Sequence, residues 1–86
     1  MEKRIGVVGI VVESKENVPR LNAVLSEFGD NIIGRMGVPY QRGKGLSVIS
    51  LIVEGTTDEI GALTGKIGNL HGINVKAALT KVNGEK

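Results

Sequence analysis

The sequence of 86 residues contains no cysteine and no tryptophan, and it has a single histidine, His71. Without cysteine the chain cannot form a disulfide, supply a thiol nucleophile, ligate an iron–sulfur cluster or build a cysteine-containing zinc site. One histidine cannot form a histidine metal cluster either. We therefore expect no metal and no cofactor, and we expect a reducing, cytoplasmic compartment.

Aromatic residues and net charge are also scarce. The chain has one phenylalanine and one tyrosine, and its 11 basic and 9 acidic residues give a net charge of +2. Nucleic-acid-binding proteins usually carry a strong positive surplus or aromatic platforms on which bases stack. We therefore expect no direct contact with nucleic acid.

What the chain does contain is aliphatic. Hydrophobic residues make up 41% of the sequence, enough for one domain near the lower size limit for folding alone. We place this domain at residues 1–82, followed by a polar tail at residues 83–86. The apolar run at residues 5–12 follows two basic residues, as in a signal peptide. It is short, lacks a small-residue cleavage site and continues into a polar segment, so we interpret it as a strand and expect no membrane association.

Periodicity and capping signals predict the first three elements. Residues 5–13 are apolar on both faces and rich in β-branched residues, as in a central strand. A helix at residues 18–28 follows, with Asn17 as the N-cap and a proline in its first turn. Residues 30–40 form a second strand, whose glycines and Pro39 place it at an edge or a bulge.

The second half of the chain repeats this order. Residues 41–45 form a hairpin turn, residues 46–54 a third strand, residues 57–70 a second helix, and residues 73–82 a fourth strand. The βαββαβ order predicts an α+β, ferredoxin-like fold. In this fold a four-stranded antiparallel sheet carries two helices on one face.

The first and third strands carry aliphatic residues at both parities, as Val7 and Val8 illustrate. Because the helices of a ferredoxin-like fold cover only one face of the sheet, the second aliphatic set would lie on a bare face. A soluble monomer does not leave such a face exposed, so we expect another subunit to cover it. The sequence therefore predicts a homo-oligomer, either a dimer or a tetramer.

The glycine-rich stretch at residues 61–72 does not fit the phosphate-binding loop pattern, which needs four residues between its glycines and a Ser or Thr after the lysine. Here three residues separate Gly61 from Gly65, and an isoleucine follows Lys66. These two glycines and Gly68 recur at helical spacing. Since glycine costs about 1 kcal/mol in a helix interior, the stripe favours close packing, within the chain or across subunits, with a local ligand contact as the alternative.

Four stretches carry a family resemblance: the opening MEKR, IVVE at the end of the first strand, DNIIGRMGVP at residues 30–39 and IGALTGKIG at residues 60–68. In them the chain resembles ACT-like regulatory domains. It is more closely similar, over nearly its whole length, to a family of small proteins named iron-only hydrogenase system regulators. The resemblance implies the ferredoxin-like fold, self-association and a regulatory role.

The second half of the chain is also similar to the C-terminal domain of nickel-responsive repressors. Those repressors bind nickel through histidines and a cysteine around the central hairpin, and they bind DNA through a separate N-terminal domain. This chain has Arg35, Val38, Tyr40 and Arg42 around its hairpin and no cysteine. The resemblance therefore implies neither nickel binding nor DNA binding.

Two candidate ligand positions follow from the ACT resemblance. ACT domains commonly bind an amino acid near the first strand–helix turn, where this chain has Asn17; the alternative is a plain capping turn. Residues 29–32 resemble the start of the second ACT strand and add Asp30 and Asn31 to the candidates.

The hairpin supplies the remaining candidates. Arg35, Arg42 and Lys44 place positive charge on and around it, and Tyr40 is a stacking or hydrogen-bonding partner. These residues form either a solvated hairpin, whose charges discourage edge pairing, or an anion site at a subunit junction with Arg35 as the forked donor.

No residues combine a nucleophile, a base and an orienting group, so we expect no enzymatic activity. We expect a non-catalytic ACT-like regulatory module of the iron-only hydrogenase system, which works as a homo-oligomer through a small-molecule effector at a subunit interface. The alternative is a scaffold subunit that binds a protein partner and no small ligand.

We expect the purified protein to contain no stoichiometric transition metal, because one histidine and no cysteine cannot enclose such an ion with the usual ligands. Elemental analysis after tag removal checks this expectation. A stoichiometric metal would contradict it and would point to carboxylates shared between subunits.

Overall fold

The computed structural model describes residues 3–40 and 46–80. Six helices and strands follow one another in the order βαββαβ, with a short 3₁₀ turn on either side of the first helix. They are β1 (Arg4–Val12), the turn η1 (Lys15–Asn17), α1 (Val18–Glu27), the turn η2 (Gly29–Asn31), β2 (Ile32–Tyr40), β3 (Leu46–Gly55), α2 (Thr57–Gly68) and β4 (Ile73–Thr80).

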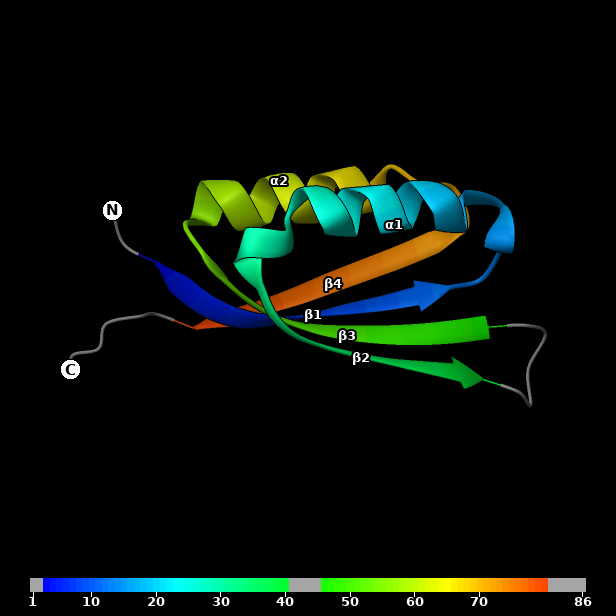
Figure 1. The fold of residues 1–86 in the computed structure, drawn as a ribbon, viewed down its shortest axis with the longest axis horizontal. Helices are drawn as coiled ribbons and strands as arrows, with labels where there is room; N and C mark the ends of the chain where they lie inside the picture. Colours follow the sequence, from blue (N-terminus) through cyan, green and yellow to red (C-terminus); the bar gives the residue numbers. More distant parts are fainter. Residues whose placement is uncertain (1–2, 41–45, 81–86) are drawn as a thin grey trace.

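The four strands form one antiparallel sheet in the order β2-β3-β1-β4. Both helices lie on the same side of this sheet and run antiparallel to each other (Figure 1). This arrangement confirms the ferredoxin-like fold expected from the sequence, with β1 and β3 as the central strands. It also confirms the edge position of β2, which has a register irregularity between Ile32 and Gly34.

The core between sheet and helices is entirely aliphatic. It is built from alternate residues of β1 and β3, from one stripe of each helix and from the first residue of β4: Val8, Ile10, Val12, Leu21, Leu25, Leu51, Val53, Ile60, Leu63, Ile67 and Ile73. Where α1 and α2 meet, the Lys66 ammonium lies 2.7 Å from the Glu27 carboxylate. Both side chains are about half exposed, so this pair adds at most about 1 kcal/mol and the apolar burial holds the layers together.

None of the described residues covers the sheet face opposite the helices. Alternation along the strands places six large apolar side chains on it, each between 42% and 63% exposed: Ile5, Val7, Met36, Val38, Val48 and Ile52. Ile33, at the bulge, is also exposed. Below, "the bare face" means this surface.

Among the described residues, two element boundaries differ from the sequence prediction by two residues, and the others differ by at most one. The second strand begins at Ile32 rather than at Asp30, because residues 29–31 form the turn η2. The second helix ends at Gly68 rather than at residue 70. Residues 81–86, which contain the end of the predicted fourth strand and the polar tail, lie outside the described residues.

The glycine stripe of α2 does not serve close packing within the chain. A methyl group placed on Gly61 or Gly65 would meet no atom within 4 Å, and one on Gly68 would make only ordinary contact with Val75, at 3.6 Å. The within-chain part of the packing prediction is therefore wrong for Gly61 and Gly65, because α2 turns its Ile60, Leu63 and Ile67 stripe toward the sheet instead.

Gly72, in the turn between α2 and β4, has a structural reason to be glycine. Its φ of +83° is in the left-handed region, and a Cβ there would lie 2.7 Å from the Cβ of Ser14. The Gly72 carbonyl also accepts a 2.8 Å hydrogen bond from the Glu13 amide. The turns that follow β1 and α2 are therefore packed directly against each other.

The contrast between these glycines gives a paired prediction. Gly65→Ala should raise the free energy of unfolding by about 0.5–1 kcal/mol, because alanine is the better helix former and meets no obstacle. Gly72→Ala should lower it by about 1–3 kcal/mol through backbone strain and the clash with Ser14. Denaturant unfolding measures both. A loss of stability in Gly65→Ala would show that another subunit packs against this helix.

Candidate functional site

A cavity of about 310 Å³ opens between α1 and the sheet, where β1 ends and β3 begins. Its lining comes from β1, α1 and β3 and from the turn η1: Val12, Lys15, Val18, Leu21, Asn22, Ser47 and Ile49. Its volume is at the lower end of the range for small-molecule sites in proteins. Below we refer to this cavity as the α1 pocket.

Local sequence explains why a cavity forms here. In the register of the sheet Val12 lies opposite Ser47, so a small polar residue occupies the end of a row that is otherwise aliphatic. Above it, the first turn of α1 directs Val18 and Leu21 toward the sheet at the i, i+3 spacing of one helix face. Serine is too small to fill the space between this end of the sheet and the helix.

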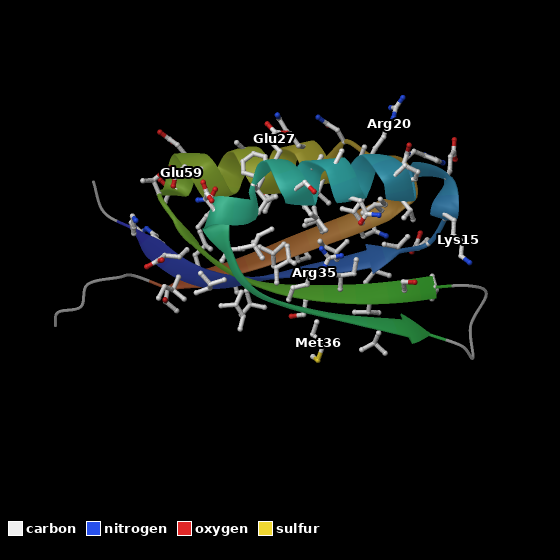
Figure 2. The ribbon with its side chains drawn as sticks, in the orientation of Figure 1. Lys15, Arg20, Glu27, Arg35, Met36 and Glu59 are labelled. Carbon is white, nitrogen blue, oxygen red and sulfur yellow. The ribbon has the colours of Figure 1, made fainter. Side chains whose placement is uncertain are left out.

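Among the described residues that line the α1 pocket, the charged side chain is that of Lys15. Lys15 extends from η1 at the pocket end of the molecule (Figure 2), while Asn22 and Ser47 supply neutral hydrogen-bonding groups. No aspartate or glutamate is among the lining residues. The arrangement combines apolar walls with a positive and hydrogen-bonding mouth, which can bind a small ligand that has an apolar part and an anionic group.

Arg35 lies on the same side of the sheet as this pocket. It is paired with Leu51, a buried residue of the helix-facing row, and Figure 2 shows Arg35 on the helix side and Met36 pointing away from the helices. Two residues along β2, Gly37 is paired with the pocket residue Ile49. Arg35 therefore adds a second positive charge to this flank, about 7 Å along the strand from Gly37.

Asn17 is the N-cap residue of α1, as predicted, and its side chain makes a contact between two turns. Its side chain makes no cap hydrogen bond to α1. Its Nδ2 donates to the carbonyl oxygen of His71 at 3.0 Å, while Ser14 caps η1 by accepting from the Glu16 amide at 3.2 Å. The side-chain capping expected of Asn17 is thus wrong, because its amide joins the two neighbouring turns.

Asn31, another predicted ligand residue, supports the start of α2. Its Nδ2 donates to the Glu54 carbonyl at 3.1 Å and to a Glu59 carboxylate oxygen at 3.3 Å. The same carboxylate accepts from the Thr56 amide at 2.9 Å, and the Thr56 hydroxyl accepts from the Glu59 amide, which forms a capping box. Its neighbour Asp30 is exposed in η2.

Among the predicted ligand residues that the structure describes, Asn17 is separated from Asp30 and Asn31. Asn17 lies at the start of α1 and Asp30 and Asn31 beyond its end, and this helix of 10 residues is about 15 Å long. Tyr40 ends β2, but its side chain is outside the described part of the structure. Arg42 and Lys44 fall in residues 41–45, also outside it.

Sequence reasoning missed Asn22 and Ser47, although one signal was present. Ser47 has the same strand parity as Ile49, Leu51 and Val53, so it is a polar residue in an otherwise aliphatic row. A polar interruption at the end of such a row marks a gap in the core. The sequence gives no comparable signal for Asn22, because polar residues commonly lie next to the apolar stripe of an amphipathic helix.

The described residues contain no group of three or more His, Asp or Glu side chains that could hold a metal ion. Of the two helices, neither is long and apolar enough to cross a membrane.

Comparison with known proteins places the chain in a family. The family model TM1266-like, described as "Iron-only hydrogenase system regulator, putative", matches residues 4–77. The chain belongs to this family. Among solved structures, this chain is similar to the uncharacterized protein TM1266 from Thermotoga maritima. The two chains are 37% identical and have a TM-score of 0.85, and the match covers 93% of this chain and 100% of TM1266.

More distant structures share the fold of the TM1266-like chain. The ACT domain from GTP pyrophosphokinase of Chlorobium tepidum has 22% identity and a TM-score of 0.70, with 91% and 89% of the two chains covered. CPII, a nitrogen regulatory PII-like protein from Thiomonas intermedia K12 bound to ADP, AMP and bicarbonate, has 20% identity and a TM-score of 0.58, with 93% and 91% covered. No curated protein matches by sequence.

The hydrogen bonds of Asn31 predict that it stabilises the TM1266-like chain. Asn31→Ala should lower the free energy of unfolding by about 1–2 kcal/mol, because it removes donors from the Glu54 carbonyl and the capping-box carboxylate. Asp30→Ala, at an exposed neighbouring position, is the control and should change stability by less than about 0.5 kcal/mol. Equal unfolding curves for the two variants would contradict a structural role for Asn31.

Proposed function

We propose that this protein is a non-catalytic, ACT-like regulatory module of the iron-only hydrogenase system that acts in the cytoplasm as a homo-oligomer and responds to a small effector. The family supports the link to the hydrogenase system. The observation that carries the proposal is the bare face, because a regulator that works by assembly needs an interface and the protomer has one uncovered.

The composition of the bare face suits contact with a second copy. Among the strand residues that the structure describes, register places two charged side chains on it, Glu54 in the row of Ile5 and Lys76 in the row of Gly9. The uncharged polar residues Ser50, Asn74 and Thr80 also lie on this face, and most of its other described positions are apolar or glycine. Burying half of an aliphatic side chain contributes about 1 kcal/mol, so stacking two such faces removes a large apolar area from water.

Gly9 adds a shape argument for this interface. It lies in the interior of β1, where glycine costs roughly 0.5–1 kcal/mol relative to alanine. It is exposed, and a methyl group there would meet no atom within 4 Å. Nothing within the described protomer requires glycine at this position, so we expect a side chain of the partner to enter the hollow between neighbouring strands.

The α1 pocket supports the effector part of the proposal. It is concave and mostly apolar, and it lies on the opposite side of the sheet from the bare face, so both can be occupied at once. A non-catalytic role is consistent with the lining: among the described residues that form it, Ser47 has the one hydroxyl, and none is a histidine, aspartate or glutamate that could activate it.

A matched pair of charge substitutions tests the assembly. Val7 is 48% exposed on the bare face and Val8 is fully buried against the helices. Val7→Asp should give a folded monomer, since it places a charge in the interface, whereas Val8→Asp should unfold the domain by burying an unpaired charge at a cost of several kcal/mol. Light scattering gives the mass and circular dichroism the fold.

Ala62→Asp, at an exposed position of α2, is the control and should keep the oligomer. In a host lacking the gene, this variant should restore normal hydrogenase activity and Val7→Asp should not. A wild-type protein that stays monomeric at high concentration would reject the proposed assembly. Restoration of activity by Val7→Asp would separate regulation from assembly and favour a scaffold role.

A further inference from the structure

We infer that the α1 pocket binds a small aliphatic monocarboxylate, whose hydrocarbon part lies between α1 and β3 and whose carboxylate pairs with Lys15. This inference rests on the proposed function, for which it names the chemical class of the effector. It excludes zwitterionic α-amino acids as preferred ligands, although they share the carboxylate and the hydrocarbon part.

The walls determine the hydrocarbon part of the ligand. Val12 and Leu21 are buried, at 2% and 1% exposure, and Val18 and Ile49 are partly buried beside them. None of these four side chains is aromatic, and none can donate or accept a hydrogen bond. A branched aliphatic chain matches such a surface, whereas a sugar or a nucleobase would leave its polar atoms without partners.

The mouth determines the polar group. Lys15 provides the one charge in the lining, and the Asn22 amide and Ser47 hydroxyl can donate hydrogen bonds. Arg35, on the same side of the sheet, raises the positive potential over this flank further. A carboxylate is attracted to these groups, while an uncharged alcohol gains only hydrogen bonds.

The absence of acidic lining residues sets the preference against amino acids. An ammonium group next to the carboxylate would approach Lys15 with like charge and would meet no aspartate or glutamate among the residues that line the pocket. It would also lose hydration on entering a mostly apolar cavity. Removing the amino group from leucine should therefore strengthen binding rather than weaken it.

Three probes of similar shape test the inference by NMR titration of the full-length protein. 4-Methylpentanoate should bind with a dissociation constant on the order of 1 mM, as expected for so few atoms, and should shift the amides of Val18, Asn22, Ser47 and Ile49. 4-Methylpentan-1-ol should bind about fivefold more weakly at the same residues, and leucine at least tenfold more weakly.

Two charge-removing variants provide the matched comparison. Lys15→Gln should weaken 4-methylpentanoate binding about fivefold and leave the alcohol unchanged, because only the ion pair is lost. Arg20→Gln removes the same charge from an exposed position on α1 that points away from the sheet (Figure 2) and should change neither affinity. Ser47→Leu should fill the cavity and abolish binding of both probes.

Three results would overturn the inference: equal affinity for leucine and 4-methylpentanoate, equal losses in the Lys15 and Arg20 variants, or no amide shifts around the α1 pocket at 20-fold the expected dissociation constant of about 1 mM. These readouts need neither an oligomer nor hydrogenase. If 4-methylpentanoate does not bind while assembly and complementation are intact, only the proposed ligand class is rejected. If assembly fails while 4-methylpentanoate still binds, only the proposed function is rejected.

Discussion

The one-sided cover of the sheet is the constraint on which the other features depend. Side chains of a strand alternate between faces, so packing Val8 and Ile10 under the helices necessarily turns Val7 and Gly9 outward. Because β1 is aliphatic at both parities, the same strand provides the core of the protomer and the apolar surface outside it. One nine-residue segment therefore supplies both part of the core and part of the exposed apolar face.

Most of the fold could be predicted from sequence because its signals are local. The β-branched run of β1, the Ile60 and Leu63 stripe of α2 and the turn glycines each identify an element within a few residues. The order of the helices and strands along the chain is then compatible with only a few sheet topologies. What could not be predicted was the η2 turn, since Asp30 and Asn31 precede an apolar run and read as part of it. Their role depends on contacts with Glu54 and Glu59, which are distant in sequence.

The candidate site was less predictable for a related reason. A pocket is a place where packing is incomplete, and completeness depends on how far a helix lies above a sheet. Lys15 could be named as part of a helix-start segment, and Ser47 interrupts an aliphatic row, but only the placement of α1 shows that the two share one cavity. Asn17 was expected to bind a ligand because of its position in the turn. In the structure its side-chain amide donates a hydrogen bond to the carbonyl oxygen of His71.

Because the side chains of β3 alternate between the two faces of the sheet, this strand borders both the α1 pocket and the bare face. Ile49 lines the α1 pocket and Val48, the next residue, lies on the bare face. Occupants of the two surfaces are thus separated by the thickness of a single backbone. If a ligand on one face and a subunit on the other each favour the same position of this strand, each must tighten the binding of the other by the same factor. A sheet one layer thick would in this way couple the proposed effector in the α1 pocket to the proposed partner on the bare face.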